Sequence, residues 1–404
     1  MRLPLDGIRI TDFCWIGAGA YTTKILADMG ADVIKIESAT YLDSLRLASP
    51  YKDNIKGINR SGYFADRNSS KRSVTVNLKT QEGLDLIRTL VRQSDIVANN
   101  FAPGTMERLG LGYEALSAIK PDLVYVAMSM HGGDGPESKT VGYGITISAI
   151  TGLQYLTTFP GKPPAGTGTN FPDHIPNPSH ACFAILAALR HRRRTGEGQQ
   201  IDLAQTEPML SLMAPALMDY SVNGRIVGPT GNRMAGCAPR GVYPCRGEDR
   251  WIAISVATDA QWAALVECLA APDLGAEIWQ HAASREGDQD RIDEVLARAT
   301  LVRTAEELMA ALQARGVPAG VAQNAADLIE HDPQLRRRGH WRYLDHPEMG
   351  RTIYNGPPFA FASGPVGPRA PAPLLGQHTD QVCRELGGMN DEAIARLKAG
   401  HVLT

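Results

Sequence analysis

The first half of this 404-residue chain alternates strand and helix signals, and this alternation restricts the fold more than any other feature. Short apolar runs predict strands at residues 8–13, 32–37, 73–78, 96–98, 123–126 and 200–203. Helical patterns lie between these runs, at residues 20–29, 81–92 and 179–194. Strands that alternate with helices are typical of a parallel sheet with helices on both of its faces. The sequence therefore predicts an α/β fold.

The pattern changes near Gly224, after an apolar stretch from Glu207 to Val222 that predicts one helix. Strand signals and then helical signals follow, which is typical of a smaller α+β domain. A short helix at 391–397 closes the chain. The expected division is a large domain at residues 1–205 and 340–404, a linker helix at 206–225, a small domain at 226–325 and a second linker at 326–339.

Composition excludes several classes of function. The net charge of −2 gives no basic surface for nucleic acid. No apolar run is long enough to cross a membrane, and residues 1–7 lack the apolar core of a secretion signal. The six cysteines have no metal-ligand spacing, so they are expected to be free thiols in a reducing cytosol. We therefore expect a cytoplasmic protein without a metal site.

Asp173 lies shortly before the predicted helix at 179–194, with Asn177 as the expected cap and Pro178 as the first helical residue. A carboxylate before a helix start faces unpaired N–H groups and the positive end of the helix dipole, and both favour its ionised form. An exposed, ionised aspartate of this kind could act as a nucleophile. Acidic residues near helix starts are also common without any chemical role, so the local sequence leaves both interpretations open.

The first strand–helix turn imitates a dinucleotide-binding motif. Gly17 and Gly19 are followed by Glu37 at the end of the next predicted strand, but Thr22 stands where the third glycine belongs. This argues against a nicotinamide or flavin dehydrogenase. The turn still suits another phosphate-bearing ligand. No Gly-x-Ser-x-Gly segment is present, which argues against an α/β-hydrolase serine.

A set of segments spread over nearly the whole chain is more specific than any single motif. They are PLDGI (4–8), GADVIKIE (30–37), NSSKRS (68–73), NFAPG (100–104), RLG (108–110), ILAAL (185–189), TGEGQ (195–199) and APLLGQHT (372–379). In this order they resemble the class III CoA-transferase family, also called the CaiB/BaiF family, which includes formyl-CoA and carnitine CoA-transferases. The resemblance implies a Rossmann-like large domain formed from both chain ends, a smaller middle domain, and two chains interlocked as a dimer.

The resemblance also implies a mechanism and a site. Asp173 matches the family's nucleophilic aspartate, which takes acyl groups and CoA in turn, so the substrates would be an acyl-CoA and a carboxylic acid. Coenzyme A thioester is then the substrate, and no tightly bound cofactor or metal is expected. The implied CoA contacts are Ile16, Gly17, Lys79, Asn100, Phe101, Ala102 and Arg108. Lys71 and Arg72 are added as phosphate partners on charge alone.

Two departures from the family pattern bear on the substrate. Formyl-CoA transferases have glutamine at the position of Gly17 and arginine at that of Ser38, which argues against formate and oxalate here. The pattern is similar to the succinyl-CoA-dependent branch, including benzylsuccinate CoA-transferase subunits. We therefore expect succinyl-CoA as the donor.

Alternatives remain within the same family. Its α-methylacyl-CoA racemases pair the aspartate with a histidine in a Gly-His-Asp segment, and this chain has Gly142, Tyr143 and Gly144 there. Tyrosine is a poor base near neutral pH, which favours transfer over racemisation. A CoA-binding partner subunit of a hetero-oligomeric transferase is a further alternative to a homodimeric enzyme.

Overall fold

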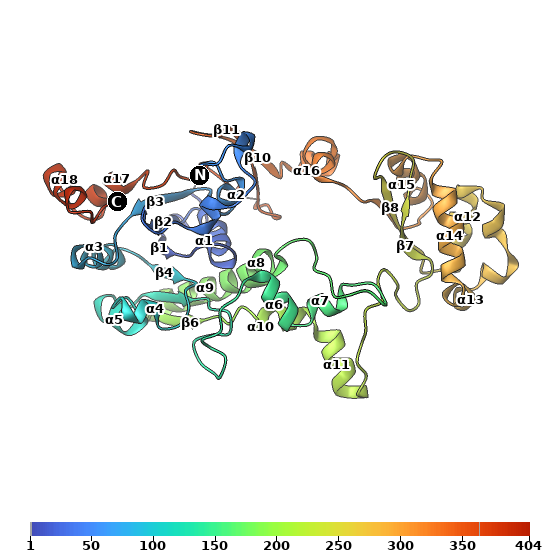
Figure 1. The fold of residues 1–404 in the computed structure, drawn as a ribbon, viewed down its shortest axis with the longest axis horizontal. Helices are drawn as coiled ribbons and strands as arrows, with labels where there is room; N and C mark the ends of the chain where they lie inside the picture. The colour runs from blue at the N-terminus through green and yellow to red at the C-terminus, as the bar shows by residue number, and fades with distance from the viewer. Residues whose placement is uncertain (1, 363) are drawn as a thin grey trace. The chain divides into compact units, whose positions relative to one another are not determined.

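The computed structural model describes residues 2–362 and 364–404, which form two compact units. The sheet unit consists of the chain up to Leu153 together with Gly166–Ile226 and Arg336–Thr404. The small unit consists of Gln154–Ala165 and Val227–Leu335. The element labels below are those of Figure 1.

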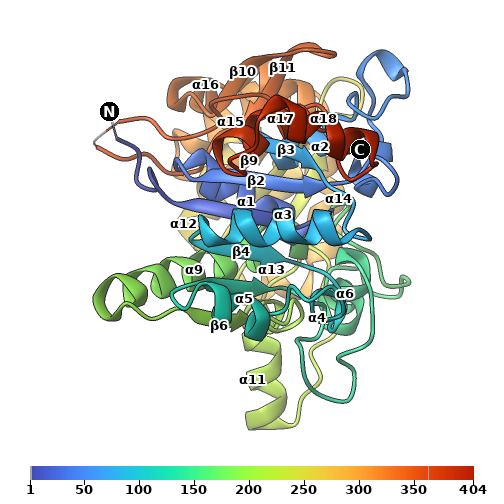
Figure 2. The same ribbon diagram turned by 90° about the vertical axis from the view of Figure 1, so that its left-hand side faces the viewer.

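The sheet unit is built on a six-stranded sheet in the order β3-β2-β1-β4-β5-β6, in which every neighbouring pair is parallel. The strands are β1 (Arg9–Phe13), β2 (Asp32–Glu37), β3 (Lys71–Thr75), β4 (Ile96–Asn99), β5 (Val124–Ala127) and β6 (Gln199–Asp202). Figure 2 shows them following one another from β3 at the top to β6 at the bottom. This is the strand order of a doubly wound Rossmann-like sheet, so the predicted α/β class is confirmed.

Helices cover both faces of this sheet. The helices of the sheet unit are α1 (Ala18–Asp28), α2 (Gly62–Asn68), α3 (Gln81–Arg92), α4 (Thr105–Arg108), α5 (Tyr113–Ile119), α6 (Gly144–Ile150), α8 (Phe171–His174), α9 (Pro176–Thr195), α10 (Glu207–Leu212), α11 (Ala214–Asn223), α17 (Thr379–Glu385) and α18 (Asp391–Ala399). One core packs α3, α5, α17 and α18 on one face, and the other packs α1 and α9 on the opposite face. A hairpin of β10 (Trp341–His346) and β11 (Gly350–Asn355) completes the unit.

Local sequence explains most of these elements. In α3 the Thr80 hydroxyl accepts a hydrogen bond from the Gly83 N–H at 3.2 Å, and Leu86, Ile87, Leu90 and Val91 form the buried stripe. The stretch 207–222 was predicted as one helix, and this is wrong. The chain leaves helical geometry at Met213, because Pro215 has no N–H to continue the ladder from the preceding turn.

The small unit has a three-stranded antiparallel sheet packed against helices. Its elements are β7 (Arg240–Pro244), β8 (Trp251–Ser255), β9 (Ala319–Val321), α12 (Asp259–Leu269), α13 (Ala282–Gly287), α14 (Gln289–Thr300) and α15 (Ala305–Gln313). The rings of Trp262 and Trp279 meet edge to face in its core, with centroids 6.4 Å apart. Two helices, α7 (Leu153–Leu156) and α16 (Pro333–Arg338), lie where the units join along the chain. Among the described helices none is long and apolar enough to cross a membrane.

Candidate active site

A pocket of about 550 Å³ opens at the carboxyl ends of the parallel strands in the sheet unit. It lies where the strand order reverses, between β1 and β4, which is the ligand-binding edge of open α/β sheets. Loops after β1, β4 and β5 form its walls together with the segment before α6 and Asp173. The lining residues are Trp15, Ile16, Gly17, Ala18, Tyr41, Asn100, Phe101, Ala102, Pro103, Ser129, Met130, Thr140, Val141, Gly142, Tyr143, Thr146, Asp173 and Gln205.

Hydrogen bonds fix the loop after β1 to the loop after β4. The amide of Asn100 accepts from the Trp15 N–H at 2.9 Å and donates to the Trp15 carbonyl at 2.7 Å. Ile16 has a φ of 59°, a strained conformation for a β-branched residue. Its N–H donates to Asp43 at 3.3 Å, and Asp43 forms a fully buried ion pair with Lys35 at 2.9 Å. The buried pair thus supports the strained turn that begins the pocket.

Asp173 is not an exposed residue ahead of a helix, and this prediction is corrected. It lies inside α8, with 5% of its surface exposed. The next helix, α9, begins at Pro176, so Pro178 is not the first helical residue and Asn177 does not cap it. The fully buried Asn177 side chain finds no hydrogen-bond partner among the described residues. Two prolines near the start of α9 are compatible with its first turn because the N–H groups there need no helical partner.

Two glycines allow the backbone to approach the Asp173 carboxyl closely. A Cβ atom added to Gly17 would lie 2.4 Å from Asp173 Cγ, and one added to Gly144 would lie 2.7 Å from Asp173 Oδ2. The backbone N–H groups of Ala18 and Gly144 act on the carboxyl and lower its pKa. Glycine is therefore required at both positions for the carboxylate to sit against these N–H groups.

The pKa of Asp173 is raised to about 6, chiefly because burial disfavours the charged form. The positive charge of Arg67 and the two backbone N–H groups oppose this rise. The expectation that the helix-start environment sets the ionisation of Asp173 is therefore wrong, because desolvation outweighs the favourable partners. At pH 7 the carboxylate still predominates, and its raised basicity suits a nucleophile.

Sequence reasoning missed Arg67 and His174, which lie beside Asp173. The side chain of Arg67 comes from α2 and contacts His174 Nε2. Burial and then the charge of Arg67 lower the pKa of His174 to about 4, so the imidazole is neutral. No local sequence pattern connects Arg67 with His174, because the two residues are 107 positions apart.

The pocket brings together six of the ten residues expected at the site: Ile16, Gly17, Asn100, Phe101, Ala102 and Asp173. The other four do not line it. Lys79, four residues beyond the end of β3, and Arg108, at the end of α4, both have exposed side chains.

Lys71 and Arg72 do not fit the phosphate-binding role that their charge suggested. Lys71 is fully buried and its Nζ forms an ion pair with Asp12 at 3.1 Å. Arg72 forms ion pairs with Asp32 at 2.6 Å and with Glu385 at 2.8 Å. Both residues begin β3, at the amino end of the strand, whereas the pocket lies at the carboxyl ends. Their charges are therefore used inside the fold.

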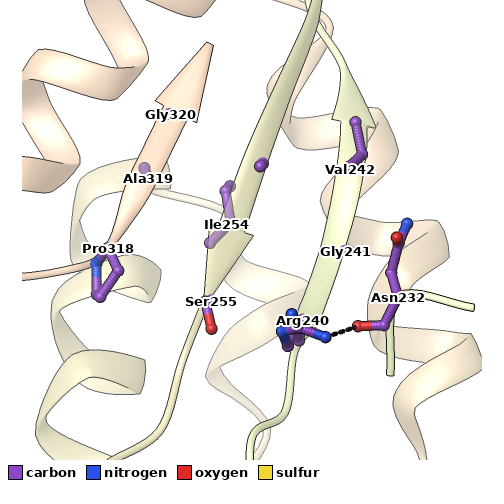
Figure 3. Close-up of a pocket in the computed structure, with 10 residues that line it drawn as sticks. Asn232, Arg240, Gly241, Val242, Ile254, Ser255, Pro318, Ala319 and Gly320 are labelled. Carbon is purple, nitrogen blue, oxygen red and sulfur yellow. Dashed lines mark hydrogen bonds between the residues drawn. The ribbon is translucent and has the colours of Figure 1, made fainter. Parts of the chain in front are cut away.

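A separate pocket of about 420 Å³ lies on the sheet of the small unit (Figure 3). Its walls are mainly backbone and small side chains of β7, β8 and β9, and Arg240 donates to the backbone carbonyl of Asn232 at 2.7 Å. The residues that line it include no carboxylate, thiol or imidazole. Within the described chain no group of acidic, histidine or cysteine side chains is arranged to hold a metal ion. The pocket around Asp173 is therefore the candidate active site.

Comparison with known proteins agrees with this geometry. The sequence pattern of CoA-transferase family III matches residues 5–379. The chain is 31% identical over 402 residues to the succinyl-CoA–D-citramalate CoA-transferase of Chloroflexus aurantiacus, covering 99% of this chain and 98% of that protein. It is 30% identical over 407 residues to the succinyl-CoA–L-malate CoA-transferase beta subunit of the same organism, with 99% and 98% covered.

The fold gives the same result. The crystal structure of a CaiB/BaiF family protein from Brucella suis superposes with a TM-score of 0.88 at 31% identity, covering 96% of this chain and 100% of that one. Both the sequence pattern and the relatives extend over most of the chain. The chain therefore belongs to CoA-transferase family III, as its segments predicted, and is a CoA-transferase enzyme.

Proposed function

We propose that this enzyme moves CoA from succinyl-CoA to a carboxylic acid through covalent intermediates on Asp173. The observation that carries the proposal is the position of Asp173. Its carboxyl lines the pocket at the ligand-binding edge of the sheet, is raised in pKa to about 6, and receives two backbone N–H groups. A buried carboxylate that remains ionised near neutral pH has the basicity and the charge needed to attack a thioester.

The reaction consists of acyl exchanges that need no external oxidant or proton source. The Asp173 carboxylate attacks the thioester carbonyl, the C–S bond breaks, and a mixed anhydride and CoA thiolate result. The thiolate attacks the aspartyl carbonyl, releases the donor carboxylate and leaves an aspartyl-CoA thioester. The acceptor carboxylate then displaces the thiolate to give a second anhydride. Attack of the thiolate on the acceptor's carbonyl forms the new acyl-CoA and restores Asp173.

The N–H groups of Ala18 and Gly144 are the proposed donors to the negative oxygen that develops at the aspartyl carbonyl. They already lower the pKa of the Asp173 carboxyl, and the close approach of Gly17 and Gly144 to that carboxyl keeps the two N–H groups near the carbon that is attacked. Along the CoA arm we propose contacts with five residues of the pocket lining: Ile16, Gly17, Asn100, Phe101 and Ala102. Lys79 and Arg108 follow the carboxyl ends of β3 and β4 along the chain, and we retain them as proposed CoA contacts.

The choice of succinyl-CoA rests on the relatives, whose names specify succinyl-CoA as a substrate. One of those relatives is a beta subunit, so both a homodimer and a pair of related chains fit the family. We propose a homodimer with interlocked chains. Every residue of α11 is exposed or half-exposed, including Leu217, Met218 and Tyr220, and α11 extends away from the sheet in Figures 1 and 2. An apolar helix of this kind requires cover from another surface.

The racemase alternative lacks a second base near Asp173. Tyr143, at the position of the racemase histidine, is 64% exposed, and a phenol is a poor general base. The neighbouring His174 is kept neutral and its Nε2 is held by Arg67. Exchange of the substrate Cα hydrogen with heavy water in the absence of an acceptor acid would favour racemisation over transfer.

The experiment that tests the proposal is capture of the covalent intermediate. The enzyme is incubated with succinyl-CoA and hydroxylamine, and the digested peptides are analysed by mass spectrometry. We expect a hydroxamate on Asp173 in the wild type and none in Asp173→Asn. The matched control is Asp202→Asn, which removes another carboxylate at the same edge of the sheet and keeps the Asp173 hydroxamate. A wild-type enzyme that turns over without any hydroxamate at Asp173 contradicts the mechanism.

A further inference from the structure

Arg67 is a buried cation beside the proposed nucleophile, and the acyl exchange itself does not use it. Only 5% of its surface is exposed, although arginine is rarely so buried without a partner. Its guanidinium lies 4.5 Å from the centroid of the Tyr21 ring and 5.3 Å from that of Tyr63. Two aromatic faces therefore hold the guanidinium plane, and such cation–π contacts strengthen when they are desolvated.

The contact with His174 has a defined polarity. Arginine has only donor groups, so Arg67 Nη2 donates and His174 Nε2 accepts. Nε2 then carries no proton, and the proton of the neutral ring is on Nδ1. Nδ1 lies 3.2 Å from the Thr169 hydroxyl oxygen and donates to it. The imidazole is thus held at both nitrogens and has no free site for a proton.

The same cation acts on Asp173, the residue that precedes His174 in α8. Its positive charge opposes the effect of burial on the pKa of the Asp173 carboxyl. Arg67 is also paired with the half-exposed Asp66 through Nη1, while its buried Nε has no partner within the described ranges. One guanidinium therefore contacts His174 and acts through its charge on the neighbouring Asp173, while the two aromatic rings hold it in place.

We propose that Arg67 is a positioning residue, which holds α8 through His174 and keeps the Asp173 carboxyl ionised for attack on the thioester. The proposal rests on the function proposed above. It assigns to α2 a part in the reaction although no residue of α2 lines the pocket. A purely structural cation would hold α8 equally well at every pH, so the pH profile separates the two roles.

Other ionisable groups that face α8 do not replace Arg67. On α1, Lys24 is bound to Asp28 at 2.7 Å, and Tyr21 contacts Arg67 through its ring. On α9, His180 Nδ1 lies 2.8 Å from the carbonyl of Pro176. The α6 sequence, Gly144–Ile150, has no ionisable side chain, and Tyr143 before it is exposed. Removal of Arg67 therefore leaves burial opposed only by the two backbone N–H groups.

The test compares the rate of hydroxamate formation from succinyl-CoA between pH 5 and 9 in the wild type, Arg67→Met and Arg67→Lys. The wild-type rate should fall below a pH of about 6, the pKa of Asp173. In Arg67→Met we expect this acid limb to move upward by about 1 pH unit or more, since an opposite charge at close range lowers a carboxyl pKa by that amount. For a shift of 1 unit the rate is then about 5-fold lower at pH 6, and it recovers toward pH 9. Arg67→Lys keeps the charge and should keep the limb near its wild-type position.

Circular dichroism of each variant shows whether it is folded, and Arg67→Gln replaces Arg67→Met if that variant is not. An acid limb at the wild-type pH in the uncharged variant, with its rate reduced equally at every pH, overturns the positioning role through charge. An equal upward shift in Arg67→Lys also overturns it, because the charge is still present. Absence of any wild-type hydroxamate is a different result, since it removes the proposed function itself.

Discussion

Replacement of Gly17 by alanine should disable the enzyme without unfolding it. The added Cβ would lie 2.4 Å from Asp173 Cγ and 2.6 and 2.8 Å from the two carboxyl oxygens, whereas ordinary contacts begin at 3.4 Å. The carboxyl must therefore move by about 1 Å, and a displacement of this size at a reacting group lowers the rate by about 100-fold. That factor corresponds to about 2.7 kcal/mol in the activation free energy.

Alanine should also lower the free energy of unfolding, because φ of −79° and ψ of −107° at Gly17 lie outside the regions that residues with a side chain favour. Overpacking of a buried site costs about 1–3 kcal/mol, and rotation of the Asp173 side chain into the pocket relieves part of it. The assay is hydroxamate formation from succinyl-CoA at pH 8, together with urea unfolding. Gly287→Ala is the matched control, since no atom lies within 4 Å of the Cβ it would add.

The reasoning is refuted if Gly17→Ala forms the hydroxamate at a rate within about twofold of the wild type, because a factor of two is below the effect of even a small displacement. It is equally refuted if Gly287→Ala loses activity to the same degree. In that case the loss would follow from alanine at any glycine and not from the approach to Asp173.

Three other predictions follow from burial and charge. Asp173→Asn should stabilise the fold above pH 6, by at most about 3 kcal/mol for a shift of about two pKa units. The pKa of Asp173 is about 6 in the folded state and 3.8 in the unfolded state, so the wild type loses stability as the pH rises from 4 to 6. Urea unfolding at pH 4 should therefore show no gain from the substitution. Lys71→Met leaves Asp12 as an unpaired buried charge and should destabilise the fold by about 3–5 kcal/mol in the same assay. Leu217 and Tyr220 of α11 are 50% and 61% exposed, and the double variant Leu217→Glu, Tyr220→Glu should be a monomer because the charges would disrupt an apolar dimer interface. Light scattering measures the molar mass, and an unchanged dimer would exclude α11 from the interface.

The sheet could be predicted from the sequence because its signals are local. The predicted strand at 32–37 and the predicted helix at 81–92 have the same bounds in the structure. Buried parallel strands appear in the sequence as runs of apolar residues, and amphipathic helices appear as apolar residues repeated every three or four positions. The break at Met213 was missed because proline is compatible with the first turn of a helix, so Pro215 allowed either one helix or two.

Charged residues in the site were harder to predict, because one sequence does not show which charges are paired. Lys71 and Arg72 carry the positive charge that a phosphate-binding residue needs, but each forms an ion pair with a carboxylate far along the chain. Lys35 lies in the middle of a predicted strand, and a lysine there is a signal of a buried pair. That signal was present in the sequence, and its partner, Asp43, is only eight residues away.

Asp173 shows why the chemistry of a site cannot be obtained from local rules. The rules for helix starts predict a stabilised, exposed anion, which would be a weak nucleophile because it would be weakly basic. Burial instead raises the pKa to about 6, and Arg67 with two N–H groups keeps it from rising further. At pH 7 this leaves about ten carboxylates for each carboxylic acid, so the group remains almost fully ionised while its basicity is raised. Both conditions depend on Arg67 of α2, which lies 107 residues before His174. They also depend on Gly17 and Gly144, where a side chain would collide with the Asp173 carboxyl. The reactivity of Asp173 is therefore a property of the assembled fold.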